Sequence, residues 1–148
     1  FKVKDDITKP KTILWQSNNS EDILSAQHFA YTRLSDPVIS KRTFHFNKEE
    51  KIIDIKDELL GGMSHEVTFN LNFHPDVKLT GKSRTVFTAQ HDNSVIEISF
   101  KCCCDALSVS IQDANYSPAY GVISNCKRIN ATLKNQFPVS FETIIKLL

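Results

Sequence analysis

Hydrophobic and polar residues alternate along much of this 148-residue chain. The clearest run is MSHEVTFNLNFHPDV at residues 63–77, where Val67, Phe69, Leu71 and Phe73 share one parity and polar residues occupy the other. A period of two places successive side chains on opposite faces of an extended strand, whereas a helix groups residues three and four apart. The run therefore predicts a strand with one apolar face and one polar face.

The same alternation recurs in five further segments. They are RTFHF, KIIDIKD, SVIEISF, LSVSIQD and VSFETIIKLL, at residues 42–46, 51–57, 94–100, 107–113 and 139–148. In the first of them the pattern predicts that Phe44 and Phe46 point inward and His45 outward. Strands spaced about 8–12 residues apart with turn residues between them are typical of antiparallel sandwiches. The predicted fold class is all-β, an antiparallel two-sheet β-sandwich of the super-sandwich type with little or no helix, formed by residues 1–148 as one domain.

Residues 20–34, SEDILSAQHFAYTRL, fit two interpretations. Ser20 is followed by two acids, as at a helix start, and apolar residues from Ile23 to Leu34 recur at roughly helical spacing. The segment also fits a strand that leads into a loop. Its own pattern does not decide between a short helix and a strand.

Charge and hydropathy exclude several classes of partner. The chain has 18 Lys and Arg against 17 Asp and Glu, so its formal net charge is +1 and no strong field attracts nucleic acid or an anionic membrane. The few basic clusters, such as Lys41 with Arg42, are expected to be solvated strand edges or turns. No run of about 18 apolar residues occurs, so no membrane span is predicted. No feature of the sequence fixes an oligomeric state.

The histidines do not form a recognisable site. They are scattered singly among polar neighbours, at His28, His45, His65, His74 and His91. His65 and His74 lie nine residues apart in one predicted strand, roughly 30 Å apart and on opposite faces, so they do not share a metal ion. A site that joins one of them to a histidine of another strand stays open. Because HExxH, GxSxG and glycine-rich phosphate loops are also missing, we predict no catalytic residue, metal or cofactor in this chain.

The four cysteines are Cys102, Cys103, Cys104 and Cys126. Their spacing fits neither a paired CxxC zinc site nor a disulfide-rich framework. Adjacent residues of a strand point to opposite faces, so Cys103 is expected to lie apart from its neighbours. Free, partly buried thiols are the favoured interpretation, and a bridge from the triplet to Cys126 stays open.

Four aromatic residues lie beside polar ones and are candidates for carbohydrate contacts, because sugar rings stack on aromatic faces. They are Trp15, Tyr31, Tyr116 and Tyr120. Packing against the sheet for Trp15, or within a loop for Tyr31, is the simpler interpretation.

Four segments, read in order, carry a resemblance to a known family. The most specific is IIDIKDELLGGMSHEVTFNLNFHPDVKL at residues 52–79, with a strand, an acidic turn, glycine, a His-x-Val strand and a His-Pro-Asp-Val ending. Residues 13–46 contain a tryptophan, a His-x-x-Tyr element and an arginine-bearing strand. YSPAYGV at 116–122 and FPVSFETII at 137–145 complete the set. Together these segments resemble the C-terminal β-sheet region of the heparinase II/III-like family.

The resemblance implies a part in polysaccharide degradation. Family members are polysaccharide lyases, or relatives of them, built from an α/α toroid followed by a β-sandwich. They act by β-elimination: a uronate carboxylate is neutralised, a tyrosine or histidine removes the proton at C5, and the glycosidic oxygen leaves from C4. Those groups lie upstream of the region that this chain resembles. The chain alone is therefore expected to be inactive.

The resemblance makes this chain the C-terminal β-sandwich domain of such a lyase, completing one wall of a cleft between domains. The fact that the chain begins at Phe1 rather than Met favours an excised fragment. The implied partner is a polysaccharide, reached together with the helical domain, and the implied location is the periplasm or cell envelope of a bacterium. The alternative is a stand-alone carbohydrate-binding or structural sandwich without lyase activity.

The resemblance also favours a strand that enters a loop at residues 26–34. It makes His28, Tyr31 and Arg33 the candidate substrate-binding residues. Arg33 is suited to pair with a carboxylate or sulfate, and Tyr31 to stack on a sugar ring.

Overall fold

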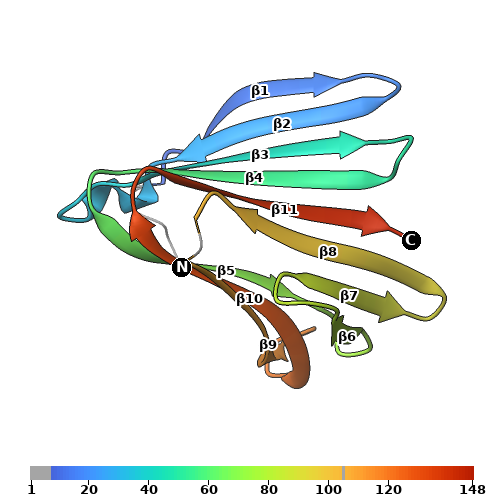
Figure 1. Cartoon of the computed structure of the whole chain (residues 1–148). Coiled ribbons are helices and arrows are strands. Elements are labelled where there is room, and N and C mark those ends of the chain that lie inside the picture. The colour runs from blue at the N-terminus through green and yellow to red at the C-terminus, as the bar shows by residue number, and fades with distance from the viewer. Residues whose placement is uncertain (1–7, 105) are drawn as a thin grey trace.

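The structure, a computed structural model, describes residues 8–104 and 106–148, which form two antiparallel sheets (Figure 1). In spatial order the eight-stranded sheet contains β1 (Lys11–Ser17), β2 (Glu21–His28), β3 (Ile39–Asn47), β4 (Ile52–Leu60), β11 (Val139–Leu147), β8 (Ser94–Cys102), β7 (Val86–His91) and β6 (Lys78–Gly81). The three-stranded sheet contains β5 (Ser64–Asn72), β10 (Ser124–Gln136) and β9 (Leu107–Tyr116). The predicted all-β two-sheet sandwich is confirmed.

The helical element within the described residues is a single 3-10 turn, η1 (Ala30–Arg33), which follows β2. Residues 21–28 form a strand, so the strand-and-loop interpretation of residues 20–34 is correct. β2 is paired with β1 on one side and β3 on the other, and these ladders satisfy its backbone N–H and C=O groups. Such non-local pairing overrides the weak helical spacing of the segment.

The core lies between β10 and the middle of the larger sheet. Ile129 and Leu133 on β10 are fully buried, as is Ile98 on β8. The buried side chains form two clusters, one with Leu133 and Phe141 and one with Ile129, Ile98 and Phe100. Fully burying an aliphatic side chain of this size stabilises the fold by about 1.5–3 kcal/mol. These side chains therefore hold the two sheets together.

The alternation predicted for residues 63–77 is present in β5. Val67, Phe69 and Leu71 are half-buried and pack against the core, while Thr68 and Asn70 are exposed. β5 is an edge strand, hydrogen-bonded to β10 alone among its neighbours in the sheet. Its apolar parity thus faces the larger sheet, and its free edge lies beside the strands that the smaller sheet does not cover.

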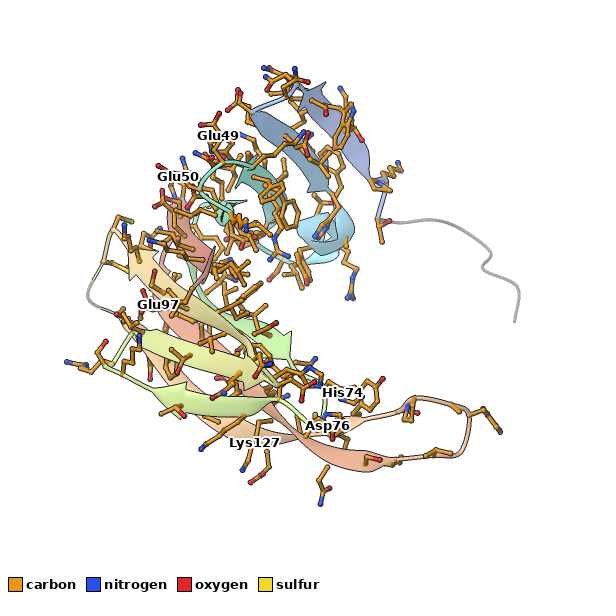
Figure 2. All side chains as sticks on the ribbon, turned by 90° about the vertical axis from the view of Figure 1, so that its right-hand side faces the viewer. Glu49, Glu50, His74, Asp76, Glu97 and Lys127 are labelled. Carbon is orange, nitrogen blue, oxygen red and sulfur yellow. The ribbon has the colours of Figure 1, made fainter. Side chains whose placement is uncertain are left out.

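Strands β1, β2 and β3 fan out beyond the smaller sheet (Figures 1 and 2). Every residue of β1 is exposed, including Trp15 at 65%. Phe44 on β3 is 37% exposed, whereas His45 is half-buried with its Nε2 2.8 Å from Oε2 of Glu21. The prediction that Phe44 points into a core is wrong, because no strand of the smaller sheet lies over β3. Phe44 faces a groove instead.

Replacing Ile98 by alanine is expected to lower the free energy of unfolding by about 2–5 kcal/mol, because a fully buried side chain leaves a cavity in the middle of the core. Ile123→Ala is the matched control: Ile123 is 72% exposed, and its loss is expected to change stability by less than about 0.5 kcal/mol. Urea unfolding measures the stability of both variants, and the slope of the free energy of unfolding against urea concentration should stay unchanged. Equal effects of the two substitutions would show that Ile98 is not part of the core.

Candidate functional site

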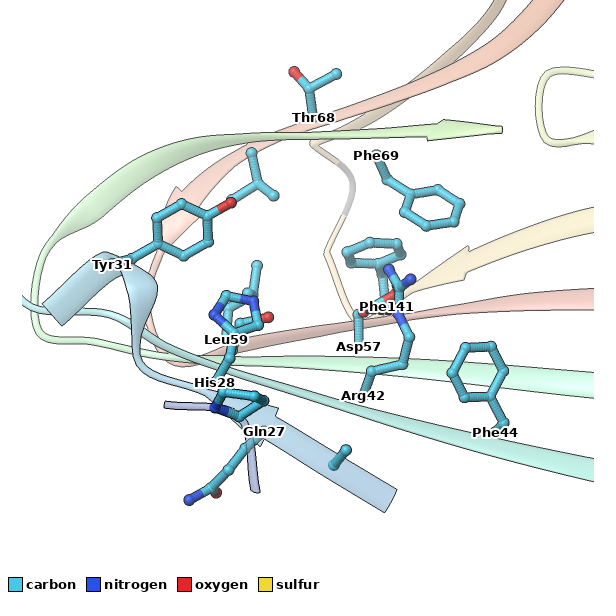
Figure 3. A pocket seen from close by; sticks show the side chains of 14 residues that line it. Gln27, His28, Tyr31, Arg42, Phe44, Asp57, Leu59, Thr68, Phe69 and Phe141 are labelled. Atoms are coloured by element: carbon cyan, nitrogen blue, oxygen red, sulfur yellow. Dashed lines mark hydrogen bonds and ion pairs between the residues drawn. The ribbon is translucent and has the colours of Figure 1, made fainter. Parts of the chain in front are cut away.

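A groove of about 420 Å³ opens between the uncovered face of the larger sheet and the edge strand β5 (Figure 3). β2, β3 and β4 provide its floor, β5 provides one wall, and η1 closes one end. Its lining combines aromatic rings with side chains that donate and accept hydrogen bonds. The groove exists because the larger sheet extends past the smaller one.

An ion pair lies in this groove. Arg42 donates from Nε to Oδ1 of Asp57 at 2.7 Å and from Nη2 to Oδ2 at 3.0 Å. The register of β3 and β4 places the two residues directly opposite each other, so both side chains leave the same face of the sheet. Asp57 is 4% exposed; burial raises the pKa of its carboxyl, and the Arg42 guanidinium opposes that rise. The bidentate contact is what stabilises a carboxylate at this depth.

Aromatic rings hold the guanidinium from two sides. The Cζ atom of Arg42 lies 4.9 Å from the ring centre of Phe69 on β5 and 5.9 Å from that of Phe44 on β3. Within the described part of the chain, Nη1 of Arg42 makes no hydrogen bond. The groove therefore presents a fixed cation with an N–H group available to an anionic or hydroxyl-bearing ligand.

His28 and Tyr31, two of the three predicted site residues, line the groove together. Their ring centres are 5.4 Å apart in an edge-to-face arrangement (Figure 3). The backbone N–H of Ala30 donates to Nδ1 of His28 at 3.3 Å, which fixes the imidazole. Tyr31 is exposed, so its ring and hydroxyl are accessible.

Arg33 lies outside the groove. It lines a separate hollow of about 490 Å³ with Lys9 and Phe29, and its Nε donates to the carbonyl oxygen of Ala30 at 3.2 Å. In a 3-10 turn of three residues per turn, residues two apart point in different directions, which separates Arg33 from Tyr31. The structure thus brings His28 and Tyr31 together and places Arg33 on the other side of η1.

Asp57 is the site residue that the sequence analysis missed. In KIIDIKDELL it shares the parity of Ile55 and Leu59, which are both buried. A single acid on the apolar parity of a strand is a recognisable signal, since a buried carboxylate needs a cationic or hydrogen-bonding partner. Its partner Arg42 is separated by 15 positions in sequence, and only the β3–β4 register reveals the pair.

His65 makes a structural contact beside the groove. Its Nε2 lies 2.6 Å from Oδ2 of Asp36, which also accepts the Met63 backbone N–H at 2.9 Å. The hydrogen bond from His65 lowers the pKa of Asp36, and the contact ties the loop before β3 to the start of β5. His74 lies 3.3 Å from a different carboxylate, that of Asp76. The two histidines of this segment share no partner among the described residues.

Residues 8–104 and 106–148 contain no group of three or more His, Cys, Asp or Glu side chains arranged to hold a metal ion. Over the same residues, no helix has the length and apolar character that crossing a membrane requires. The chemistry that the groove offers is recognition: a cation, a histidine, a phenol and aromatic faces, all suited to an anionic ligand with hydroxyl groups.

The antiparallel two-sheet fold is consistent with the comparisons with known proteins. The chain matches the family model "Heparinase II/III-like, C-terminal" over residues 3–145. The chain therefore belongs to this family of C-terminal domains. No curated protein sequence gives a significant match.

Solved structures share the fold. Heparinase III, the BT4657 gene product, has a TM-score of 0.79 and 19% identity, over 94% of this chain and 21% of that chain. The heparan sulfate lyase HepC from Pedobacter heparinus has a TM-score of 0.80 and 14% identity, over 94% of this chain and 22% of that one. At these identities the likeness establishes the fold alone. The chain spans about a fifth of the length of either protein.

Replacing Arg42 by methionine is expected to lower the free energy of unfolding by about 3 kcal/mol at neutral pH, because the Asp57 carboxylate is left buried without its partner. This value is at the low end for broken buried pairs, since the Arg42 side chain is 38% exposed and solvent screens part of the interaction. This loss of stability should shrink as pH falls. Burial raises the pKa of Asp57 in the folded protein above its ordinary 3.8. The contribution of the protonated carboxyl to the free energy of unfolding is therefore fully present below 3.8 and is lost as pH rises through the pKa of the folded protein.

Two controls accompany this prediction. Arg42→Met combined with Asp57→Leu is expected to recover most of the loss, because no buried charge remains. Lys127→Met removes the exposed pair with Asp113 and should cost less than about 1 kcal/mol. Urea unfolding at neutral and acidic pH measures all variants. Equal losses for Arg42→Met and Lys127→Met would disprove the role given to burial.

Proposed function

We propose that this chain acts as the C-terminal β-sandwich domain of a polysaccharide lyase that cleaves uronate-containing chains by β-elimination, without supplying the catalytic base. Membership of the heparinase II/III-like C-terminal family over residues 3–145 is the observation that carries the proposal. Solved proteins that share its fold include, by name, a heparinase III and a heparan sulfate lyase. In this proposal residues 1–148 are one domain of a larger protein with an α/α toroid, and the toroid carries the chemistry.

The groove contributes a wall along which the sugar chain lies. His28 and Tyr31 contact the sugar at the η1 end, with Tyr31 against a ring and His28 hydrogen-bonded to a hydroxyl. Exposure of Tyr31 and the edge-to-face contact between the two rings support this role. Arg33 lies across η1 from them, so a polysaccharide that runs over this turn brings a carboxylate or sulfate group to Arg33.

The proposal also includes a location and a class of partner. The protein acts in the periplasm or cell envelope of a bacterium, binds carbohydrate, and has no nucleic-acid partner. A net charge of +1 supports the last point, as does the pairing of Lys41 and Lys127 with acids on neighbouring strands.

In the longer protein that contains this domain, Tyr31→Leu is expected to lower kcat/KM about tenfold without changing Tm, since an aromatic contact contributes about 0.5–1.5 kcal/mol. Arg33→Ala should raise KM by removing an ion pair with the substrate. Tyr120→Leu is the matched control, because Tyr120 is fully exposed in the β9–β10 hairpin, away from the groove. The ultraviolet absorbance of unsaturated uronate products from heparan sulfate or alginate measures turnover.

Two results would count against the proposal. If Tyr31→Leu and Arg33→Ala lower Tm but leave turnover per folded molecule normal, Tyr31 and Arg33 stabilise the structure and do not contact the substrate. Sugar binding without any unsaturated product from the longer protein would favour a stand-alone carbohydrate-binding sandwich over a lyase domain.

A further inference from the structure

Three consecutive cysteines lie where the chain leaves the larger sheet for the smaller one. Cys102 ends β8, and Cys103 and Cys104 form a bend that leads to β9 (Figure 1). The Sγ atoms of Cys102 and Cys104 are 3.0 Å apart. A disulfide requires about 2.05 Å between sulfurs, so the pair is about one ångström short of a bond. The bend at Cys103 is what brings residues two apart in sequence into contact.

The pair differs from the two other cysteines in its surroundings. Cys102 and Cys104 are half-buried against the core that contains Leu133, whereas Cys103 is exposed. Cys126 is buried on β10 opposite Ala114 on β9, seven residues before Leu133, which corresponds to about 23 Å along the strand. This separation excludes the bridge from the triplet to Cys126 that the sequence left open. All four thiols are free.

A hollow beside the pair is lined by two cations, Arg84 and Lys101. Cations next to thiols favour the thiolate and attract anionic reagents. Burial, reinforced by the contact with Cys104, raises the pKa of Cys102 to about 12. The 3.0 Å contact places each sulfur of the pair where it can complete the bond once the other has reacted.

We propose that Cys102 and Cys104 are a reversible redox site that reacts with small anionic disulfides, of which glutathione disulfide is the test case. One thiol of the pair loses its proton and attacks, as the thiolate, one sulfur of the reagent, which forms a mixed disulfide and releases one glutathione thiolate. The other thiol then loses its proton, attacks the protein sulfur of the mixed disulfide and displaces the second glutathione thiolate. Two electrons pass from the pair to the reagent, and the two glutathione thiolates take up the two protons that the thiols have lost, which gives two molecules of glutathione.

The position of the pair explains why the bond should be reversible and local. A bridge that spans three residues constrains the unfolded chain very little, so it adds little stability and is readily reduced. Cys102 and Cys103 each donate from Sγ to the carbonyl oxygen of Ser140 at 3.6 Å, and the Cys102–Cys104 bond removes the first of these contacts and leaves the second intact. Oxidation thus fixes the bend between the two sheets, and Cys103 keeps the bend in contact with β11.

Mass spectrometry of the protein after incubation in glutathione buffers of increasing oxidised fraction tests the proposal. Samples are quenched in acid and alkylated while denatured. Cys103→Ser provides the background, because it removes the exposed thiol. In this background the alkylated cysteines should fall from three to one, with a mass loss of two hydrogens that dithiothreitol reverses. Cys126→Ala should not change this response.

Two variants in the Cys103→Ser background separate the steps. Cys102→Ser should stop at a single glutathione adduct on Cys104, because the sulfur that completes the bond is gone. Cys104→Ser should form no bond and take up at most one glutathione on Cys102, because only one sulfur of the pair remains. Cys102→Ala and Cys104→Ala serve if the serine variants unfold.

The wild-type protein gives an independent answer. All four cysteines fall on one tryptic peptide, residues 102–127, so fragmentation of the oxidised peptide locates the bond. A bond between Cys102 and Cys104 supports the proposal. A bond to Cys103 or Cys126, disulfide-linked dimers, or three alkylated cysteines at every glutathione ratio in Cys103→Ser would overturn it.

Discussion

The packing of one strand, β10, against β8 and β11 is the contact on which the rest of the domain depends. β10 lies in the middle of the smaller sheet and contributes Ile129 and Leu133, both fully buried. Ile129 shares a core cluster with Ile98 of the larger sheet, and Leu133 shares a second cluster with Phe141. β5 and β9 are placed by their pairing with β10, so the whole smaller sheet follows its position.

The unequal size of the two sheets then creates the groove. Three strands cover only part of eight, and β1 to β3 extend beyond the edge strand β5. Asp57 on β4 lies at this boundary, deep enough to be buried and close enough to the open face for Arg42 to reach it. Phe69 of β5 holds the guanidinium from the opposite wall. The groove therefore needs both sheets, although its floor belongs to one of them.

Local pattern predicted six of the eleven strands among the described residues, namely β3, β4, β5, β8, β9 and β11, but it did not predict β10 or what the strands place together. Alternation correctly assigned Val67 and Phe69 to the apolar face of β5, because the apolar positions within this strand indicate which of its faces is buried. It failed for Phe44, since an apolar residue can face a groove as well as a core. The Arg42–Asp57 pair depends on the register between strands, which no single segment encodes.

The site residues show the same division between local and non-local information. The resemblance to the family directed attention to residues 28–33, and the structure places His28 beside Tyr31 in the groove. The direction of Arg33 follows from the 3-10 geometry of η1, which the sequence pattern did not predict. Amide hydrogen exchange of the longer protein, with and without a uronate-containing oligosaccharide, tests the central claim most directly. We expect added protection at η1 and β5, whereas protection confined to the β9–β10 hairpin would contradict a substrate-binding role for the groove.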